Sequence, residues 1–324
     1  MEKKKFIEKL GERYSGNPSV VAVTVSFVNA MTNDWFIPHF IGRIGNTEVN
    51  QVEDWLKIGY THEKMLRVGV ETIETWAESF PNQVLKLPLG VTREDLDGSK
   101  TRLAEEIISY GYENYPDRFY VQVNALCPNL PSPDELVDII EGEPLYLLKL
   151  LVEHTPNIGL QLLAAASNWY KDDCRLNNRE YPCYPRIVLL ESIEKALTYD
   201  PSYIEYWMED GGNKRLESII EYATSAMRDH LAVYIEKPMG FCFFDKQFIP
   251  MNLPLVIGDV TIKPVVYPKH VDKVEFYIND NLVYVDTEEP YEYIFNDKPG
   301  LYKMRVKIYN DNESTEYENT ILHL

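Results

Sequence analysis

The sequence predicts an α/β region with a parallel sheet, followed by an all-β region. Up to about residue 240, strand-like runs alternate with helical runs, and each of five strand-like runs follows a helical one. After residue 252, apolar residues recur with period two in short runs, which turn residues such as Asn279, Asp280 and Asn281 separate. A chain of 324 residues can form two ordinary domains, so we expect one over residues 1–240 and one over residues 252–324.

The helices of the first region are predicted from apolar residues at helical spacing, as in residues 62–80, which end at Pro81. A proline stands at each joint between a helix and the next strand, because proline cannot continue a helix. Helices preceding parallel strands imply right-handed crossovers. The expected helices are 4–14, 62–80, 100–115, 144–154, 192–199 and 215–227, and the expected strands are 19–28, 83–90, 118–126, 157–168 and 202–210.

The second region is predicted to be a β-sandwich, because short strands joined by tight turns fill about 70 residues. The turns include Lys298, Pro299 and Gly300. The expected strands are 259–267, 272–280, 281–287, 291–295, 300–309 and 318–324.

In a (β/α)8 barrel, the turns from a helix to the next strand lie at the amino ends of the strands, the face that contributes to stability. The carboxyl ends of the strands carry the catalytic residues. Strand parity places one group of polar side chains on the inner face of the five strands. Buried polar groups need hydrogen-bond partners, and two interpretations of what supplies them here stay open. The group is either a self-satisfied network with an ion pair between Lys86 and Glu205, or a site for a polyhydroxylated ligand. Its members are Ser26, Lys86, Gln122, Asn124, Gln161 and Glu205.

Aromatic residues favour a carbohydrate as that ligand, because an indole face can stack on a sugar ring. Trp35, Trp169 and Trp207 stand at or just past the predicted loop ends of strands, and parity places Trp207 inside. Asn168, beside Trp169, is a further candidate for bonding sugar hydroxyls.

Residues 274–295, VEFYINDNLVYVDTEEPYEYIF, and the following GLYKMRVKIYNDN resemble the bacterial Ig-like module that is often attached to extracellular carbohydrate-active enzymes. The resemblance covers nearly the whole second region. It implies an Ig-like β-sandwich that acts as a spacer or packing partner.

Residues 6–35, FIEKLGERYSGNPSVVAVTVSFVNAMTNDW, resemble the helix and fourth strand of glycoside-hydrolase (β/α)8 barrels related to β-galactosidase-like families. YIEYW, residues 203–207, resembles their final strand. The resemblance implies an acid/base role for Asp34, where the family has Glu. Retaining members of the family carry the second carboxylate in the segment that corresponds to residues 159–169, GLQLLAAASNW, which has none, so either Glu205 takes its place or the protein is not a retaining hydrolase. The resemblance implies a glycoside hydrolase acting on a polysaccharide or glycoside. The alternative is a non-catalytic carbohydrate-binding or cell-surface protein with a degenerate barrel.

The resemblance places the five strands as strands four to eight, so strands one to three are missing. A fragment of a longer product is the favoured explanation, and closure by another chain or an open sheet are the alternatives. A longer product would be extracellular or at the cell surface. The chain itself leaves the compartment open, since it shows no export signal.

Several partner classes are disfavoured. Lys and Arg total 32 and Asp and Glu total 51, and the net charge of −19 would repel nucleic acid. No apolar run is long enough for a membrane span. We expect no cofactor and no metal, since nucleotide-binding and zinc motifs are absent. Cys174 and Cys183 could form a disulfide or remain free thiols. His39 is expected to be a loop or interface residue, and residues 209–213 are expected to be a solvated turn.

Overall fold

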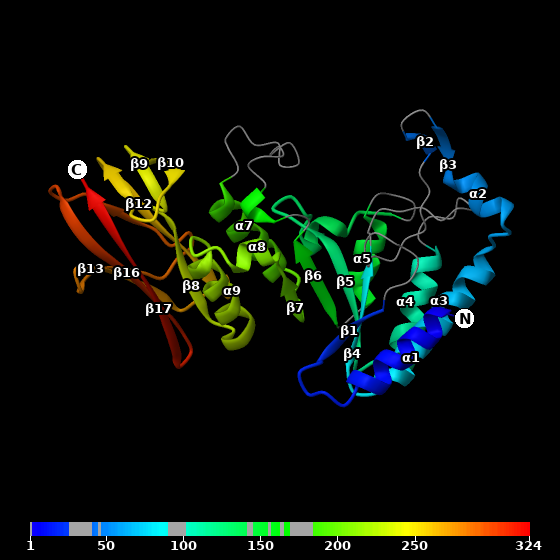
Figure 1. Ribbon diagram of the computed structural model, residues 1–324. Coiled ribbons are helices and arrows are strands. Elements are labelled where there is room, and N and C mark those ends of the chain that lie inside the picture. Colours follow the sequence, from blue (N-terminus) through cyan, green and yellow to red (C-terminus); the bar gives the residue numbers. More distant parts are fainter. Residues whose placement is uncertain are drawn as a thin grey trace. The chain divides into compact units, whose positions relative to one another are not determined.

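A computed structural model gives the structure of the protein. It describes residues 2–25, 41–44, 47–89, 102–140, 145–154, 157–162, 165–168 and 184–324. The chain forms two compact units (Figure 1). The first unit comprises Met1–Leu163 and Thr198–Glu205, and the second comprises Ala164–Leu197 and Tyr206–Leu324.

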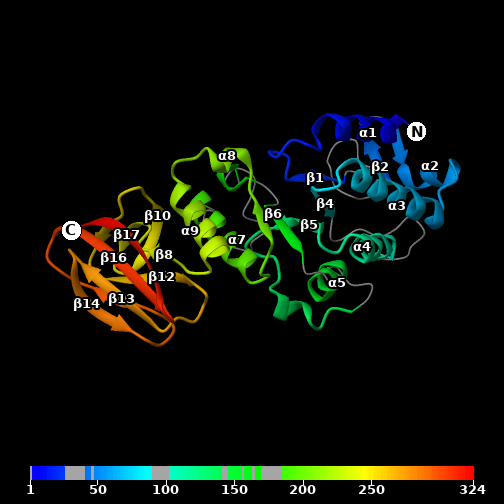
Figure 2. The same ribbon diagram turned by 90° about the horizontal axis from the view of Figure 1, so that it is seen from below.

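The first unit contains a curled sheet of five parallel strands, which forms half of a barrel (Figure 2). The strand order is β1, β4, β5, β6 and β7, so each strand lies next to those that precede and follow it in this sheet. This arrangement confirms the predicted parallel βα repeat. The strands are β1 (Ala22–Thr24), β4 (Val84–Leu89), β5 (Phe119–Leu126), β6 (Ile158–Leu162) and β7 (Tyr203–Glu205).

One face of this sheet is buried and carries the apolar side chains at alternate positions along the strands. Leu85 and Leu87 of β4 and Phe119 and Val121 of β5 are fully buried. Helix α4 (Arg102–Asn114) approaches β5 so closely that a Cβ at Gly111 would lie 2.3 Å from the Phe119 ring. The apolar residues that alternate with Lys86 in β4 and with Gln122 in β5 therefore belong to the core.

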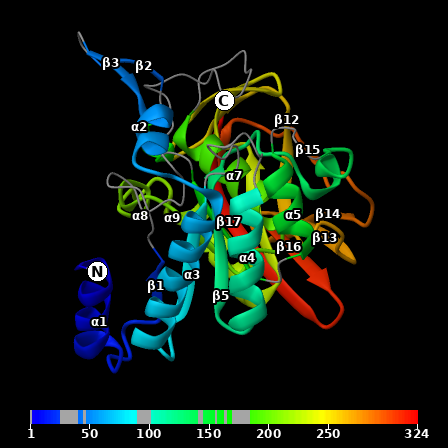
Figure 3. The same ribbon diagram turned by 90° about the vertical axis from the view of Figure 1, so that its right-hand side faces the viewer.

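Three helices of the first unit pack side by side (Figure 3). Helix α1 (Glu2–Tyr14) contacts α3 (His62–Ser79), and α3 contacts α4. Thr61 caps α3 at its N-terminus by accepting a hydrogen bond from the Lys64 N–H. Arg118 donates to the carbonyls of Ala77 and Phe80 at the other end. The remaining elements are β2 (Ile41–Ile44), β3 (Thr47–Asn50), α2 (Gln51–Lys57), η1 (Pro133–Leu136) and α5 (Tyr146–His154).

The second unit combines helices with two sheets. Its seven-stranded sheet has the order β10, β9, β11, β17, β16, β13 and β14, and its three-stranded sheet has the order β15, β12 and β8. The helices are η2 (Ala166–Asn168), α7 (Pro185–Leu197), α8 (Met208–Gly211) and α9 (Glu217–Asp229). The strands are β8 (Ala232–Lys237), β9 (Gly240–Phe243), β10 (Lys246–Pro250), β11 (Leu255–Ile257), β12 (Val260–Tyr267), β13 (Lys273–Ile278), β14 (Asn281–Asp286), β15 (Tyr293–Phe295), β16 (Gly300–Asn310) and β17 (Glu313–His323).

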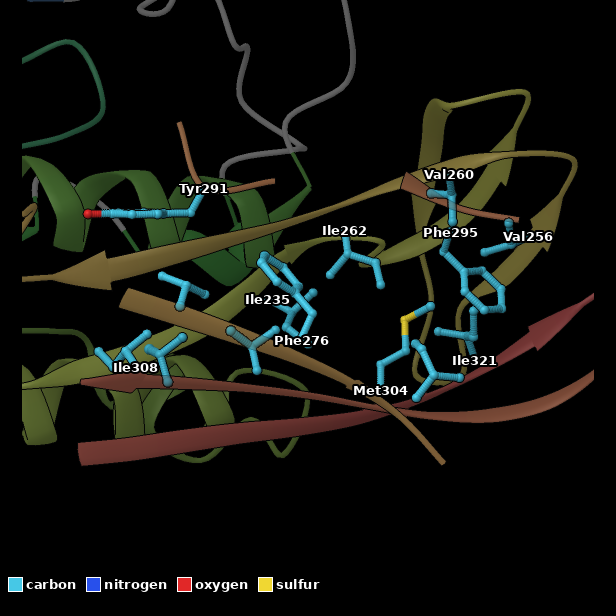
Figure 4. Close-up of a cluster of buried hydrophobic side chains, with 14 of the residues drawn as sticks. Ile235, Val256, Val260, Ile262, Phe276, Tyr291, Phe295, Met304, Ile308 and Ile321 are labelled. Carbon is cyan, nitrogen blue, oxygen red and sulfur yellow. The ribbon is translucent and has the colours of Figure 1, made fainter. Parts of the chain in front are cut away.

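Apolar side chains from both sheets share one core (Figure 4). Ile235 of β8 and Ile262 of β12 meet Phe276 of β13 and Met304 of β16 in this cluster. Antiparallel and mixed β sheets therefore follow the half-barrel, as the period-two pattern predicts.

Strands β8 to β11 were not anticipated, although β8 pairs with β12 of the C-terminal sheets. The division of the chain at residues 240 and 252 into two independent domains stays a prediction. Among the described residues, no helix is long and apolar enough to cross a membrane.

Candidate functional site

A carboxylate held by two side chains lies on the polar face of the curled sheet. Lys86 Nζ of β4 donates to Glu205 Oε2 of β7 over 2.8 Å. Gln161 Nε2 of β6 donates to the other oxygen, Oε1, over 2.9 Å. Gln161 and Glu205 stand opposite each other in the register of β6 and β7. The structure therefore contains the Lys86–Glu205 ion pair that the interpretation as a self-satisfied network includes, and the interpretation as a ligand site stays a prediction.

The curl of the sheet is what brings Lys86 to Glu205. Strands β5 and β6 lie between their strands, and three spacings of about 4.8 Å would separate β4 from β7 by about 14 Å in a flat sheet. Side chains standing on a flat sheet do not span that distance. Because the sheet is concave on this face, the two side chains converge and meet.

A second network lies beside the first. The Tyr203 hydroxyl donates a hydrogen bond of 2.9 Å to Gln122 Oε1, and Gln122 Nε2 donates one of 2.6 Å to Asn124 Oδ1. Burial raises the pKa of Tyr203, and the charge of Glu205 raises it further, so the hydroxyl keeps its proton and acts as a donor. Gln122 is only 2% exposed, and both of its amide atoms are satisfied.

Aromatic rings complete this face. Tyr203 stacks on Tyr120 with ring centroids 6.4 Å apart and planes 19° apart. Lys86 Nζ lies 5.8 Å from the centre of the Tyr203 ring, so the ammonium group faces a carboxylate and an aromatic ring. Tyr120 is two residues from Gln122 and Tyr203 is two residues from Glu205, so strand parity puts both rings on this face, but neither is among the predicted site residues.

The Glu205 carboxylate remains accessible. Its side chain is 37% exposed and that of Lys86 is 20% exposed. Glu205 ends β7, so it stands at the carboxyl edge of the parallel sheet, where (β/α)8 enzymes place their chemistry. This arrangement can accept and donate hydrogen bonds to a polar ligand.

Two further predicted site residues belong to the second unit. Asn168 ends η2, and Trp207 is the N-cap residue of α8 with 42% exposure, both in the second unit. The prediction that Trp207 continues the inner face of strand β7 is wrong, because β7 ends at Glu205. The residues that lie outside the described part of the chain are Ser26, Asp34, Trp35, His39, Trp169, Cys174 and Cys183.

Asp210 corrects the expectation that residues 209–213 form a solvated turn. Its side chain is fully buried and accepts hydrogen bonds from the N–H groups of Ala166 and Ser167, each over 2.8 Å. The carboxylate therefore ties α8 to η2 within the second unit. Among the described residues, no group of three or more His, Cys, Asp or Glu side chains is arranged to hold a metal ion.

Comparisons with solved structures give distant similarities that include glycoside hydrolases. This chain is similar to Bacteroides uniformis beta-glucuronidase 2, with TM-score 0.43 and 10% identity over 84% of this chain and 33% of that chain. It is also similar to the endo-beta-1,4-mannanase from Thermotoga petrophila, with TM-score 0.27 and 11% identity over 80% of this chain and 83% of that chain. A third similarity is to the Clostridium thermocellum CbhA fibronectin(III)-like modules, with TM-score 0.22 and 17% identity over 29% of this chain and 46% of that chain.

This chain thus spans about a third of the matched β-glucuronidase and less than half of the matched fibronectin(III)-like protein. No family model and no curated protein matches the sequence.

Proposed function

We propose that this chain acts on a polysaccharide or a glycoside at the polar face of strands β4 to β7. The observation that carries the proposal is the Glu205 carboxylate, which Lys86 and Gln161 hold in an accessible position. Sugar hydroxyls both donate and accept hydrogen bonds, so a carboxylate among amide and ammonium groups suits them. Gln122 and Asn124 extend the same polar face.

In the catalytic form of the proposal, Asp34 donates a proton to the glycosidic oxygen and Glu205 is the second carboxylate. Hydrolysis of a glycosidic bond requires such a pair on either side of the bond. Trp35, Trp169 and Trp207 stack on sugar rings, and Asn168 bonds a hydroxyl. No cofactor and no metal takes part in this scheme.

A second candidate function is non-catalytic carbohydrate binding, and one feature favours it. Both oxygens of Glu205 already accept hydrogen bonds from protein donors. Attack on a sugar carbon or proton transfer by Glu205 would first have to weaken one of these bonds. Binding of a hydroxyl to a remaining lone pair would leave both in place.

Turnover of aryl glycosides and polysaccharides by the wild type, Asp34→Asn and Glu205→Gln separates these functions. Glu209→Gln, at an exposed carboxylate, is the matched control. The catalytic form predicts wild-type turnover that falls at least roughly hundredfold in Asp34→Asn and Glu205→Gln. The non-catalytic form predicts glycan binding without turnover. Wild-type turnover that persists unchanged in both variants would contradict the assignment of Asp34 and Glu205.

A further inference from the structure

A cleft of about 530 Å3 in the second unit combines an apolar lining with two arginines. Its apolar residues are Pro250, Met251, Leu253, Leu255 and Leu322, and Asn252 is a further polar residue beside Arg186 and Arg215. It shares no residue with the polar face of the curled sheet. Its volume falls within the range of small-molecule sites.

Arg186 is positioned in this cleft by neutral partners. Its Nη2 donates to the Tyr234 hydroxyl over 2.6 Å, and its Nη1 donates to the Met251 carbonyl over 3.2 Å. Its Nε is buried and has no partner among the described residues. These bonds fix the guanidinium group, and neither of them is to a carboxylate.

Arg215 contributes a second cation to the cleft. Its side chain forms no hydrogen bond or ion pair within the described part of the chain, and Arg186 has no carboxylate partner there either. The whole chain carries 51 acidic residues against 32 basic ones. Arg186 therefore stands out in the described part of the chain, because an arginine that is partly removed from water normally has an anionic partner. Arg215 adds an exposed positive charge to the same cleft.

The apolar part of the cleft is also left open to solvent. Met251 is 41% exposed and Leu253 is 44% exposed. An aliphatic lining offers almost no partners for sugar hydroxyls, so a carbohydrate does not suit this cleft. A hydrocarbon group would instead displace water from these side chains.

We propose that this cleft binds a small organic acid with an aliphatic body. The carboxylate pairs with the guanidinium groups of Arg186 and Arg215, since arginine forms strong, directional bonds with carboxylates. The hydrocarbon chain lies on Met251, Leu253 and Leu255. This site is separate from the proposed carbohydrate site and does not depend on it.

Octanoate is a suitable probe, and octan-1-ol is its uncharged counterpart. Titration of protein with labelled methionine and leucine methyl groups, followed by NMR, locates binding. The proposal predicts saturable shifts of the Met251, Leu253, Leu255 and Leu322 methyl signals with octanoate. It predicts roughly tenfold weaker binding of octan-1-ol, because the alcohol lacks the charge that strengthens hydrogen bonds to arginine.

The variant Arg215→Gln tests the role of charge, and Lys214→Gln removes the neighbouring exposed cation as a control. Arg215 is exposed, so its replacement should leave the fold intact. The expected result is an octanoate Kd that rises roughly tenfold in Arg215→Gln and stays unchanged in Lys214→Gln. Absence of saturable shifts in the wild type would overturn the proposal. Equal affinity for octanoate and octan-1-ol, or an unchanged Kd in Arg215→Gln, would also overturn it.

Discussion

The ring of Tyr203 occupies the space that a side chain at Gly159 would need. A Cβ built on Gly159 would lie 2.1 Å from Tyr203 Cζ, and the two residues are partners in the register of β6 and β7. The missing side chain lets the ring lie across β6, where its hydroxyl reaches Gln122 on β5. A glycine on one strand thus positions a donor on the polar face of the sheet.

Gly159→Ala should therefore destabilise the first unit. The methyl group would force the Tyr203 ring away and break its bond to Gln122, and overpacking of this kind typically costs about 1 to 3 kcal/mol. Urea unfolding measures the change. Gly16→Ala is the control, because a Cβ there meets nothing within 4 Å. Equal stability of the two variants would contradict the role given to Gly159.

Replacement of the buried Asp210 should destabilise the second unit. Asp210→Ala would leave the N–H groups of Ala166 and Ser167 without their acceptor, and each unsatisfied buried group costs about 1 to 3 kcal/mol. Thermal and urea unfolding compare this variant with Glu209→Ala, at an exposed neighbour. A similar small effect in both would show that the carboxylate does not hold η2.

The stability of the C-terminal sheets should fall in acid because of Glu275. Burial of Glu275 opposes its ionisation, but hydrogen bonds from Lys273, Tyr277 and Tyr309 outweigh burial and lower the pKa to about 2. A carboxyl with a lowered pKa stabilises the folded state above its ordinary pKa of 4.5, and the stabilisation is lost as the pH falls towards 2.

Glu275→Gln should accordingly be less stable than the wild type at pH 6, and the difference should shrink towards pH 2. Urea unfolding across this range measures it, with Glu313→Gln at an exposed position as the control. A difference that does not change with pH would contradict the predicted titration.

Glu194 of α7 should have the opposite pH dependence. Burial and the nearby charge of Glu236 raise its pKa to about 7, against the effect of Lys263, which pairs with Glu236 over 3.0 Å. Tyr222 of α9 is a further titratable neighbour. Because the folded state binds this proton more tightly than the unfolded state, stability is lost as the pH rises from about 4.5 through 7.

Glu194→Gln, which imitates the protonated form, should be more stable than the wild type at pH 8 and similar to it at pH 4.5. Denaturant unfolding at both pH values tests this, with Glu221→Gln as an exposed control on α9. Equal stability of the wild type and Glu194→Gln at pH 8 would rule out the raised pKa.

The alternation of helices and strands made most of the first unit predictable. Residues such as Leu85, Phe119 and Val121 identify the buried face through period two alone, and the polar residues between them identify the other face. Strand parity also brought Lys86 and Glu205 to one face. It could not give their contact, because this depends on how strongly the sheet curls.

Other features left little trace in the sequence. Asp210 sits in an acidic run with glycines, which is typical of an exposed turn, and only the fold brings Ala166 and Ser167 to it. Strand β8 follows a helix, as the strands of the first unit do. It nevertheless ends at Lys237 and pairs with β12, which begins only at Val260. Such pairing depends on tertiary contacts that local periodicity does not encode.

The polar face around Glu205 is proposed to bind carbohydrate. The most direct measurement is the Kd of the wild type and of Glu205→Gln for a glycan that a glycan array identifies, with the free energy of unfolding of both proteins measured in parallel. The proposal predicts that the Kd rises roughly tenfold or more in Glu205→Gln, because a charge-assisted bond to the sugar is lost. The proposal is contradicted if the wild type binds no glycan. It is also contradicted if Glu205→Gln binds the glycan as tightly as the wild type but has a lower free energy of unfolding, since the network would then only stabilise the sheet.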